Sequence, residues 1–247
     1  MADWNESPRT QQQGFGSVPR TGTMPAGVTF DEGLRKHMLS IYNYMTSGIL
    51  LTGIVALLTA RSGLAITFAT GPLMWLVALS PLAIVFAMSF GANRFSKTTL
   101  QALFWGFATL MGLSLSTIFL IYTGESIAAT FFATAGAFAG LSLFGYTTKK
   151  DLSGWGSFLI MGVVGLLIAS VINIFLGSGT MSLVISFLGV LIFAGLTAYD
   201  TQRLKTEYGY YRGTEFAGKA VILGALSLYL DFINMFLFLL RFMGSRE

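Results

Sequence analysis

The chain has 247 residues, of which 54% are hydrophobic and 11% are charged, and its formal net charge is +4. Soluble domains carry about 25% charged residues, so this composition excludes a soluble globular enzyme and, outside the polar N-terminus, an intrinsically disordered chain. The sequence has no cysteine and one histidine, His37, which excludes disulfides, thiolate metal sites and multi-histidine metal sites.

The first 37 residues are polar and differ from everything that follows. They contain Pro8, Pro19 and Pro25 and a short glutamine run, a composition that predicts a disordered tail. The basic, apolar and cleavage regions of a secretory signal peptide do not occur here in their usual order. We therefore predict a disordered cytoplasmic N-terminal tail at 1–37 and a transmembrane domain at 38–244.

Seven long apolar runs fill the rest of the chain. A spanning helix needs about 20 mostly apolar residues, because the hydrocarbon core is ~30 Å thick and a helix rises ~1.5 Å per residue. The runs lie at 39–60, 71–90, 100–122, 127–146, 155–176, 181–199 and 220–242. Since the connections are short, we predict an all-α membrane protein with seven transmembrane helices in one bundle. Gly136 and Gly140 in the fourth run are expected to permit close helix packing.

The distribution of basic residues predicts the orientation, because Lys and Arg next to spanning segments stay in the cytoplasm. Twelve of the fifteen basic residues fall on the side of the N-terminus. These are Arg9, Arg20, Arg35, Lys36, Arg94, Lys97, Lys149, Lys150, Arg203, Lys205, Arg212 and Lys219. The opposite side carries Arg61, Arg241 and Arg246. We predict a cytoplasmic N-terminus and, after seven spans, a C-terminus outside the cytoplasm.

Two carboxylic acids lie in or beside the last two apolar runs. Asp231 is in the middle of the seventh run, with Asn234 one turn further on, and Asp200 directly follows the sixth run. Ionisable groups at membrane depth are costly and usually face the protein interior or a water-filled path. Asp231 lies roughly 15 Å into its helix by the helical rise. The two carboxyl groups can therefore meet only if Asp200 is recessed or the last helix is tilted.

Such a pair would act as a latch controlled by protons. The protonated carboxyl groups share a hydrogen bond, whereas the ionised groups repel each other unless a cation lies between them. Ca²⁺ prefers about 6–8 oxygen ligands, and Asp200 and Asp231 offer at most four. Water, backbone carbonyls or Asn234 must supply the rest, so we expect weak binding, which suits passage of an ion better than storage.

Each acid also has a structural interpretation. Asp231 could be satisfied by a hydroxyl or backbone group. Asp200, near the cytoplasmic boundary, could form an interfacial ion pair with Arg203 or Lys205. The sequence leaves these interpretations open beside the latch.

Three segments resemble the transmembrane Bax-inhibitor-motif family in its bacterial branch. GLTAYDTQRLK at 195–205 is similar to the signature that closes the sixth helix of the family, and LYLDFINMFLFLLRFMG at 228–244 is similar to its last helix. YTTKKDLSGWG at 146–156 also resembles the family pattern. The resemblance extends over roughly residues 30–244, and the two Asp-containing motifs together make it specific.

The resemblance implies a fold in which the last helix is central and the other six wrap around it. It also implies a calcium leak in the bacterial inner membrane with pH-dependent gating. The paired aspartates of the family map onto Asp200 and Asp231, which become the proton sensors and transient metal ligands. An arginine on the second helix of the family can engage the pair when the path is closed, and its nearest match here is Arg94.

The sequence leaves two other functions to consider beside the leak. An intramembrane aspartyl protease would share the Tyr199–Asp200 dipeptide, but Asp231 does not follow a Gly-x-Gly sequence and there is no Pro-Ala-Leu. A regulator that binds a membrane protease or translocon component without transport is the principal alternative. We therefore predict that the chain is not an enzyme and has no organic cofactor. The expected partners are lipid, Ca²⁺ and protons, with other membrane proteins under the alternative and no nucleic acid.

Overall fold

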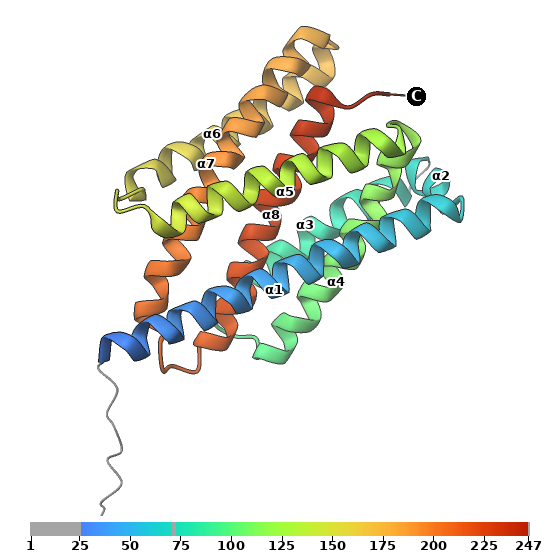
Figure 1. Cartoon of the computed structure of the whole chain (residues 1–247). Helices are drawn as coiled ribbons and strands as arrows, with labels where there is room; N and C mark the ends of the chain where they lie inside the picture. Colours follow the sequence, from blue (N-terminus) through green and yellow to red (C-terminus); the bar gives the residue numbers. More distant parts are fainter. Residues whose placement is uncertain (1–25, 71–72, 247) are drawn as a thin grey trace, which may run out of the picture.

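The computed structural model describes residues 26–70 and 73–246. Within these residues the chain forms eight α-helices and one short 3-10 helix (Figure 1). The helices are α1 (Ala26–Arg61), α2 (Leu64–Ala69), α3 (Leu73–Gly91), α4 (Lys97–Leu115), η1 (Ser116–Leu120), α5 (Gly124–Thr147), α6 (Ser153–Leu176), α7 (Gly179–Tyr211) and α8 (Ala217–Met243). Seven of them, all except the short α2 and η1, are long and apolar enough to cross a membrane. The predicted all-α, seven-span architecture is confirmed.

The first helix begins earlier than the sequence suggested. α1 starts at Ala26, so the predicted boundary between residues 37 and 38 falls inside this helix. Leu34, His37, Met38 and Ile41 are buried, and their spacing of three and four residues places them on one face of a helix. This apolar face extends α1 toward the N-terminus. The predicted disorder of residues 1–25 lies outside the described residues.

α7 is longer than its apolar run. The run ends at residue 199, but the helix continues to Tyr211. Leu204 and Tyr208, four residues apart in this extension, are both buried, so packing sustains the helix where average hydropathy falls. The extension recesses Asp200, which lies ~16 Å of helical rise from the end of α7. One of the two geometric conditions for an aspartate pair is thereby met.

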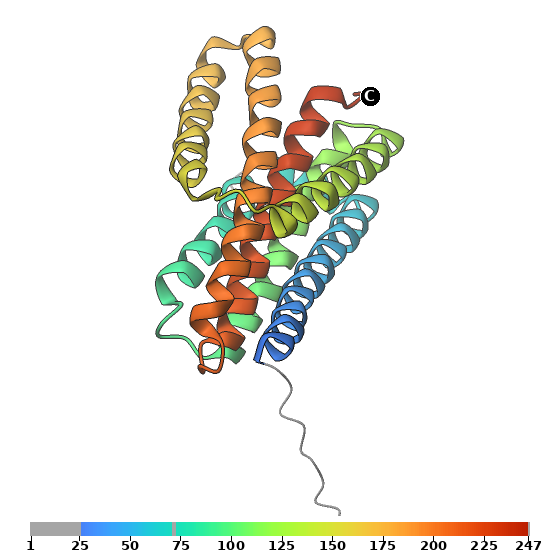
Figure 2. The same cartoon turned by 60° about the vertical axis from the view of Figure 1, so that its left-hand side comes forward.

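α8 is the most deeply buried of the seven spans. It packs extensively against α1, α4, α5 and α7, whereas α3 packs mainly on α4 and α6 mainly on α7 (Figures 1 and 2). The expectation of a central last helix is met. Of the other six spans, four pack directly on α8, and α3 and α6 flank those four. Apolar side chains on α3 and α6 remain exposed, as suits helices that face lipid.

Close helix contact depends on different glycines from those predicted. A Cβ added to Gly136 or Gly140 would meet nothing within 4 Å, whereas one added to Gly145 would collide with the backbone of Ala198. Gly145 therefore permits the contact between α5 and α7. The GxxxG spacing on α5 was a wrong guide here, because it does not reveal which face of the helix meets a neighbour.

The connections divide between two ends of the bundle. The start of α1, the α3–α4 turn and the α7–α8 turn lie together at one end, and the C-terminus lies at the other (Figure 1). This arrangement is the one that an odd number of spans requires. That the end with the start of α1 faces the cytoplasm stays a prediction.

Candidate functional site

Asp200 on α7 and Asp231 on α8 line one cavity of about 400 Å³ between α6, α7 and α8. Each aspartate is only 5% exposed. The cavity walls are otherwise largely apolar, and the polar side chains that line it are Ser170, Tyr199, Asp200, Arg203, Ser227, Asp231 and Asn234. We refer to this space as the dyad cavity.

The α7–α8 hairpin brings the two acids to the same cavity. These helices are joined by a short turn at 212–216 and form the most extensive helix pair of the fold. Counted from that turn, Asp200 is ~16 Å and Asp231 ~21 Å along its helix at 1.5 Å per residue. The two acids are therefore about one helical turn apart in depth. The structure thus places both acids on one cavity, and their action as a coupled pair stays a prediction.

Asp200 is held by two side chains. The Ser227 hydroxyl donates a hydrogen bond of 2.7 Å to Asp200 Oδ2, and Arg203 Nη2 lies 3.3 Å from the same oxygen. Arg203 Nη2 also donates to Ser227 Oγ at 3.0 Å. Carboxylate, hydroxyl and guanidinium thus form a closed triangle, in which a positive charge neutralises Asp200 inside the cavity.

A second acid continues this network toward the end of α7. Arg203 Nε lies 3.6 Å from Glu207 Oε1, and the side chains of Arg203 and Glu207 are 35% and 38% exposed. The Arg203 guanidinium carbon also lies 5.8 Å from the centre of the Tyr199 ring. The guanidinium therefore lies between a buried acid and a more exposed one, at the border of the dyad cavity.

Asp231 differs from Asp200 in its surroundings. Its Oδ2 is buried without a hydrogen-bond partner among the described residues. Asn234 lines the same cavity, and its Nδ2 donates to the Leu230 carbonyl at 2.8 Å. A buried carboxylate oxygen without a donor is costly, so it marks a position suited to a proton or a cation.

The oxygens around the cavity fit weak binding of a hard cation. Asp200, Ser227, Asp231 and Asn234 all supply oxygen atoms, the ligand type that Ca²⁺ prefers. Within the described part of the chain, no group of three or more His, Cys, Asp and Glu side chains could hold a metal ion. The arrangement is therefore a two-carboxylate site that lacks the ligand set of a tight calcium site.

Arg94, the predicted latch residue, does not line this cavity. It lies on the exposed turn that follows α3, where its backbone N–H donates to the Gly91 carbonyl at 2.9 Å. Arg203 occupies the position next to Asp200 instead. A contact between Arg94 and the pair in another conformation stays a prediction.

The sequence predicts Arg203 and Lys205 only as possible ion-pair partners of Asp200 at the membrane interface. Arg203 does make that ion pair, whereas Lys205 Nζ donates to the Tyr146 carbonyl at 2.8 Å. Ser227 was not singled out, although it lies four residues before Asp231 and hence on the same face of α8. That spacing is the signal that could have found it.

Comparison with known proteins gives matches over most of the chain. A family model described as "Inhibitor of apoptosis-promoting Bax1" matches residues 34–247. An uncharacterized protein of Caulobacter vibrioides is 49% identical over 234 residues, covering 90% of this chain and 93% of the relative. Inner membrane protein YbhL of Escherichia coli K12 is 44% identical over 219 residues, covering 87% and 94%. An uncharacterized protein of Rickettsia prowazekii is 46% identical over 221 residues, covering 89% and 93%.

Proposed function

The chain belongs to the family of the inhibitor of apoptosis-promoting Bax1, and on this premise we propose that it is a pH-sensitive calcium leak gated by Asp200 and Asp231. The resemblance found in the sequence is thereby confirmed. Seven apolar helices and the inner-membrane relative support a multi-pass protein of the bacterial inner membrane. We further propose that the N-terminus is cytoplasmic and the C-terminus periplasmic or extracellular. We also propose that the chain is not an enzyme, and we assign no catalytic role to the pair.

The observation that carries the proposal is the unequal pairing of two acids in one membrane-embedded cavity. Asp200 has a cationic partner, Arg203, and Asp231 Oδ2 has no partner among the described residues. In a low-dielectric site, two carboxylates become ionised together only when positive charge is close. Either the guanidinium or a metal ion can supply that charge to Asp200.

We propose that the guanidinium and the cation compete for Asp200. With Arg203 in place, Asp200 is neutralised and the oxygens of the dyad cavity are not all available to a cation. When Arg203 moves toward Glu207 and solvent, Asp200 and Asp231 become the transient ligands of Ca²⁺. The few oxygens bind Ca²⁺ weakly, and weak binding allows the ion to leave again.

Protons enter this scheme through the same two carboxyl groups. A protonated carboxyl group has no charge to attract a cation, so lower pH reduces occupancy of the site. Ca²⁺ flux is therefore expected to fall as pH falls, because the site attracts the cation only when both carboxyl groups are ionised. Protons and Ca²⁺ act as antagonists at one site.

The decisive experiment is Ca²⁺ flux against pH for the full chain reconstituted in liposomes that contain a Ca²⁺-sensitive dye. Wild type is compared with Asp200→Asn and Asp231→Asn, which keep the side-chain shape and remove the ionisable group. Asp151→Asn is the matched control, because Asp151 lies on the exposed α5–α6 connection. We expect both cavity variants to lose flux or its pH response and the control to behave as wild type.

Two results would overturn the proposal. One is an Asp200→Asn variant that keeps the full pH response of wild type. The other is absence of flux at every pH in protein shown to be folded by its thermal transition. Absent flux together with a co-purifying membrane protein would favour the non-transporting regulator.

A further inference from the structure

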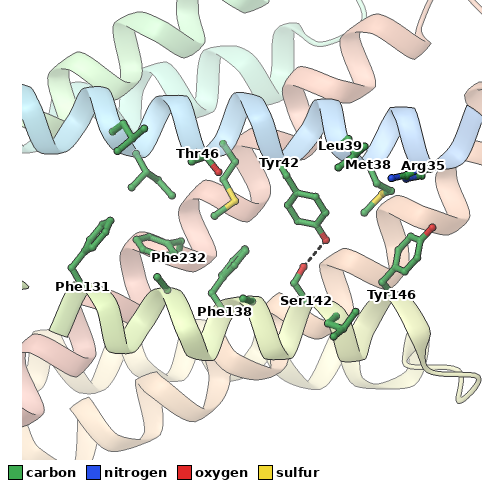
Figure 3. A pocket seen from close by; sticks show the side chains of 16 residues that line it. Arg35, Met38, Leu39, Tyr42, Thr46, Phe131, Phe138, Ser142, Tyr146 and Phe232 are labelled. Atoms are coloured by element: carbon green, nitrogen blue, oxygen red, sulfur yellow. Dashed lines mark hydrogen bonds between the residues drawn. The ribbon is translucent and has the colours of Figure 1, made fainter. Parts of the chain in front are cut away.

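A second and larger cavity lies on the opposite side of α8, between α1 and α5. It has a volume of about 690 Å³, within the range of ligand pockets. Its walls run from Arg35 to Leu50 on α1 and from Phe131 to Tyr146 on α5, with Phe232 of α8 at its base (Figure 3). We call it the α1–α5 groove. At 1.5 Å per residue it is ~22 Å long, most of the depth of a ~30 Å hydrocarbon core.

The groove exists because α1 and α5 each pack against α8 more than against each other. Its deep wall is formed by buried residues such as Met38, Met45 and Phe138. A hydrogen bond of 2.5 Å between the Tyr42 and Ser142 hydroxyls crosses it (Figure 3). Both hydroxyl groups are thereby satisfied, so the remaining surface of the groove is largely apolar.

The rim of the groove is open along its length. Leu39, Leu50 and Leu143 line it and are 49%, 56% and 62% exposed. In a membrane these side chains meet lipid, so an acyl chain can enter from the side. A flexible apolar chain suits a long groove of this kind, because it can follow the irregular wall between two helices.

One end of the groove carries positive charge. Arg35 of α1 and Tyr146 of α5 lie at this end (Figure 3). Lys205 Nζ donates to the Tyr146 carbonyl and lies 5.0 Å from the centre of its ring. Among the side chains that the structure describes, which begin at Glu32, both ion pairs involve Arg203, so none of these acids forms an ion pair with Arg35 or Lys205. This end is the same one that the distribution of basic residues assigns to the cytoplasm.

We propose that the α1–α5 groove binds one acyl chain of an anionic phospholipid, whose phosphate group lies against Arg35 with Lys205 nearby. The apolar groove and its cationic mouth match the two parts of such a lipid in the order in which a membrane presents them. This inference concerns the side of α8 away from the dyad cavity and does not depend on the proposed function.

The test uses quenching of a single tryptophan by lipids with brominated acyl chains. The four native tryptophans are replaced by phenylalanine, and Leu143→Trp places the reporter on the rim of the groove. Phe158→Trp is the matched control. Phe158 lies near the start of α6, is 66% exposed and does not line the groove. Each protein is reconstituted in vesicles that contain a small fraction of brominated phosphatidylglycerol or brominated phosphatidylcholine.

We expect phosphatidylglycerol to quench the Leu143→Trp reporter more strongly than phosphatidylcholine, with roughly five-fold preference per basic residue engaged. The Phe158→Trp reporter should show no such preference. Arg35→Gln should reduce the preference about five-fold, and Arg61→Gln, at the other end of α1, should leave it unchanged. Soluble glycerol phosphate should not displace the lipid, because it lacks the acyl chain.

Four outcomes would refute the lipid site. Equal quenching of the Leu143→Trp reporter by the two lipids would show that the groove does not select an anionic headgroup. An unchanged preference in Arg35→Gln would show that Arg35 does not contact the headgroup. Displacement by glycerol phosphate would show a phosphate site without an acyl chain. If neither lipid quenches the reporter while both quench Phe158→Trp, something other than lipid covers the groove.

Discussion

Arg203 and Asp200 are one turn apart on α7, and Arg203 Nη2 lies 3.3 Å from Asp200 Oδ2. Ser227 of α8 bonds to both side chains, so the ion pair also ties α7 to the central helix. The side chain that neutralises the acid is 35% exposed, which gives it a route out of the dyad cavity. Arg203 therefore has the contacts expected of a side chain that competes with a bound cation for Asp200.

Replacing Arg203 should open the leak. Arg203→Gln removes the charge that competes with Ca²⁺ for Asp200, and charged hydrogen bonds contribute about 1.5–3 kcal/mol. We therefore expect Ca²⁺ flux at neutral pH to rise about tenfold in the liposome assay. Lys205→Gln is the control, because Lys205 contacts Tyr146 and not the acids. Wild-type flux in Arg203→Gln would contradict the competition between guanidinium and cation.

Arg94→Gln, tested in the same assay, separates two candidates for the latch. The family resemblance points to Arg94, whereas the described geometry places Arg203 beside Asp200 and Arg94 on an exposed turn. We expect a smaller rise in flux for Arg94→Gln than for Arg203→Gln. The reverse order would show that the closed conformation uses an approach of α3 that differs from this structure.

Ser227→Ala should loosen the same latch without removing a charge. The variant deletes the donor to Asp200 Oδ2 and the acceptor of Arg203 Nη2. The loss should lower the free energy of unfolding by about 1 kcal/mol and raise flux less than Arg203→Gln does. Ser170→Ala, on the α6 wall of the same cavity, should leave both flux and the thermal transition near those of wild type.

The two acids should differ in their effects on stability. Asp200→Asn removes the partner of Arg203 and should lower the free energy of unfolding by about 1 kcal/mol, because exposure of the guanidinium limits the loss. Asp231→Asn removes a carboxylate with an unpaired buried oxygen and should leave the thermal transition unchanged or raise it. An equal loss of stability in both variants would indicate that Asp231 is a structural acid.

Substitutions of two glycines on α5 should have opposite effects on thermal stability. Gly145→Ala places a methyl group against the Ala198 carbonyl and should cost about 1–3 kcal/mol through displacement of α5 from α7. Gly136→Ala meets nothing within 4 Å and should stabilise the helix by up to ~1 kcal/mol. Equal thermal transitions for the two variants would show that α5 and α7 do not approach closely at Gly145.

The sequence alone determined the number of spans and identified Asp200 and Asp231 as the candidate site residues. Apolar runs of about 20 residues are compatible with few structures other than spanning helices, and carboxylates near such runs stand out because they are costly in lipid. The paired Asp motifs around Asp200 and Asp231 also identified the family correctly. These features are local, and each depends on composition within a short window.

Only the tertiary structure decided which side chains meet. The triangle of Asp200, Arg203 and Ser227 depends on the depth and rotation of α8 beside α7. Hydropathy does not encode that rotation, because lipid-facing and buried positions are equally apolar. For the same reason the sequence pointed to Gly136 where Gly145 makes the contact, ended α7 before its packed extension, and gave no sign of the groove between α1 and α5.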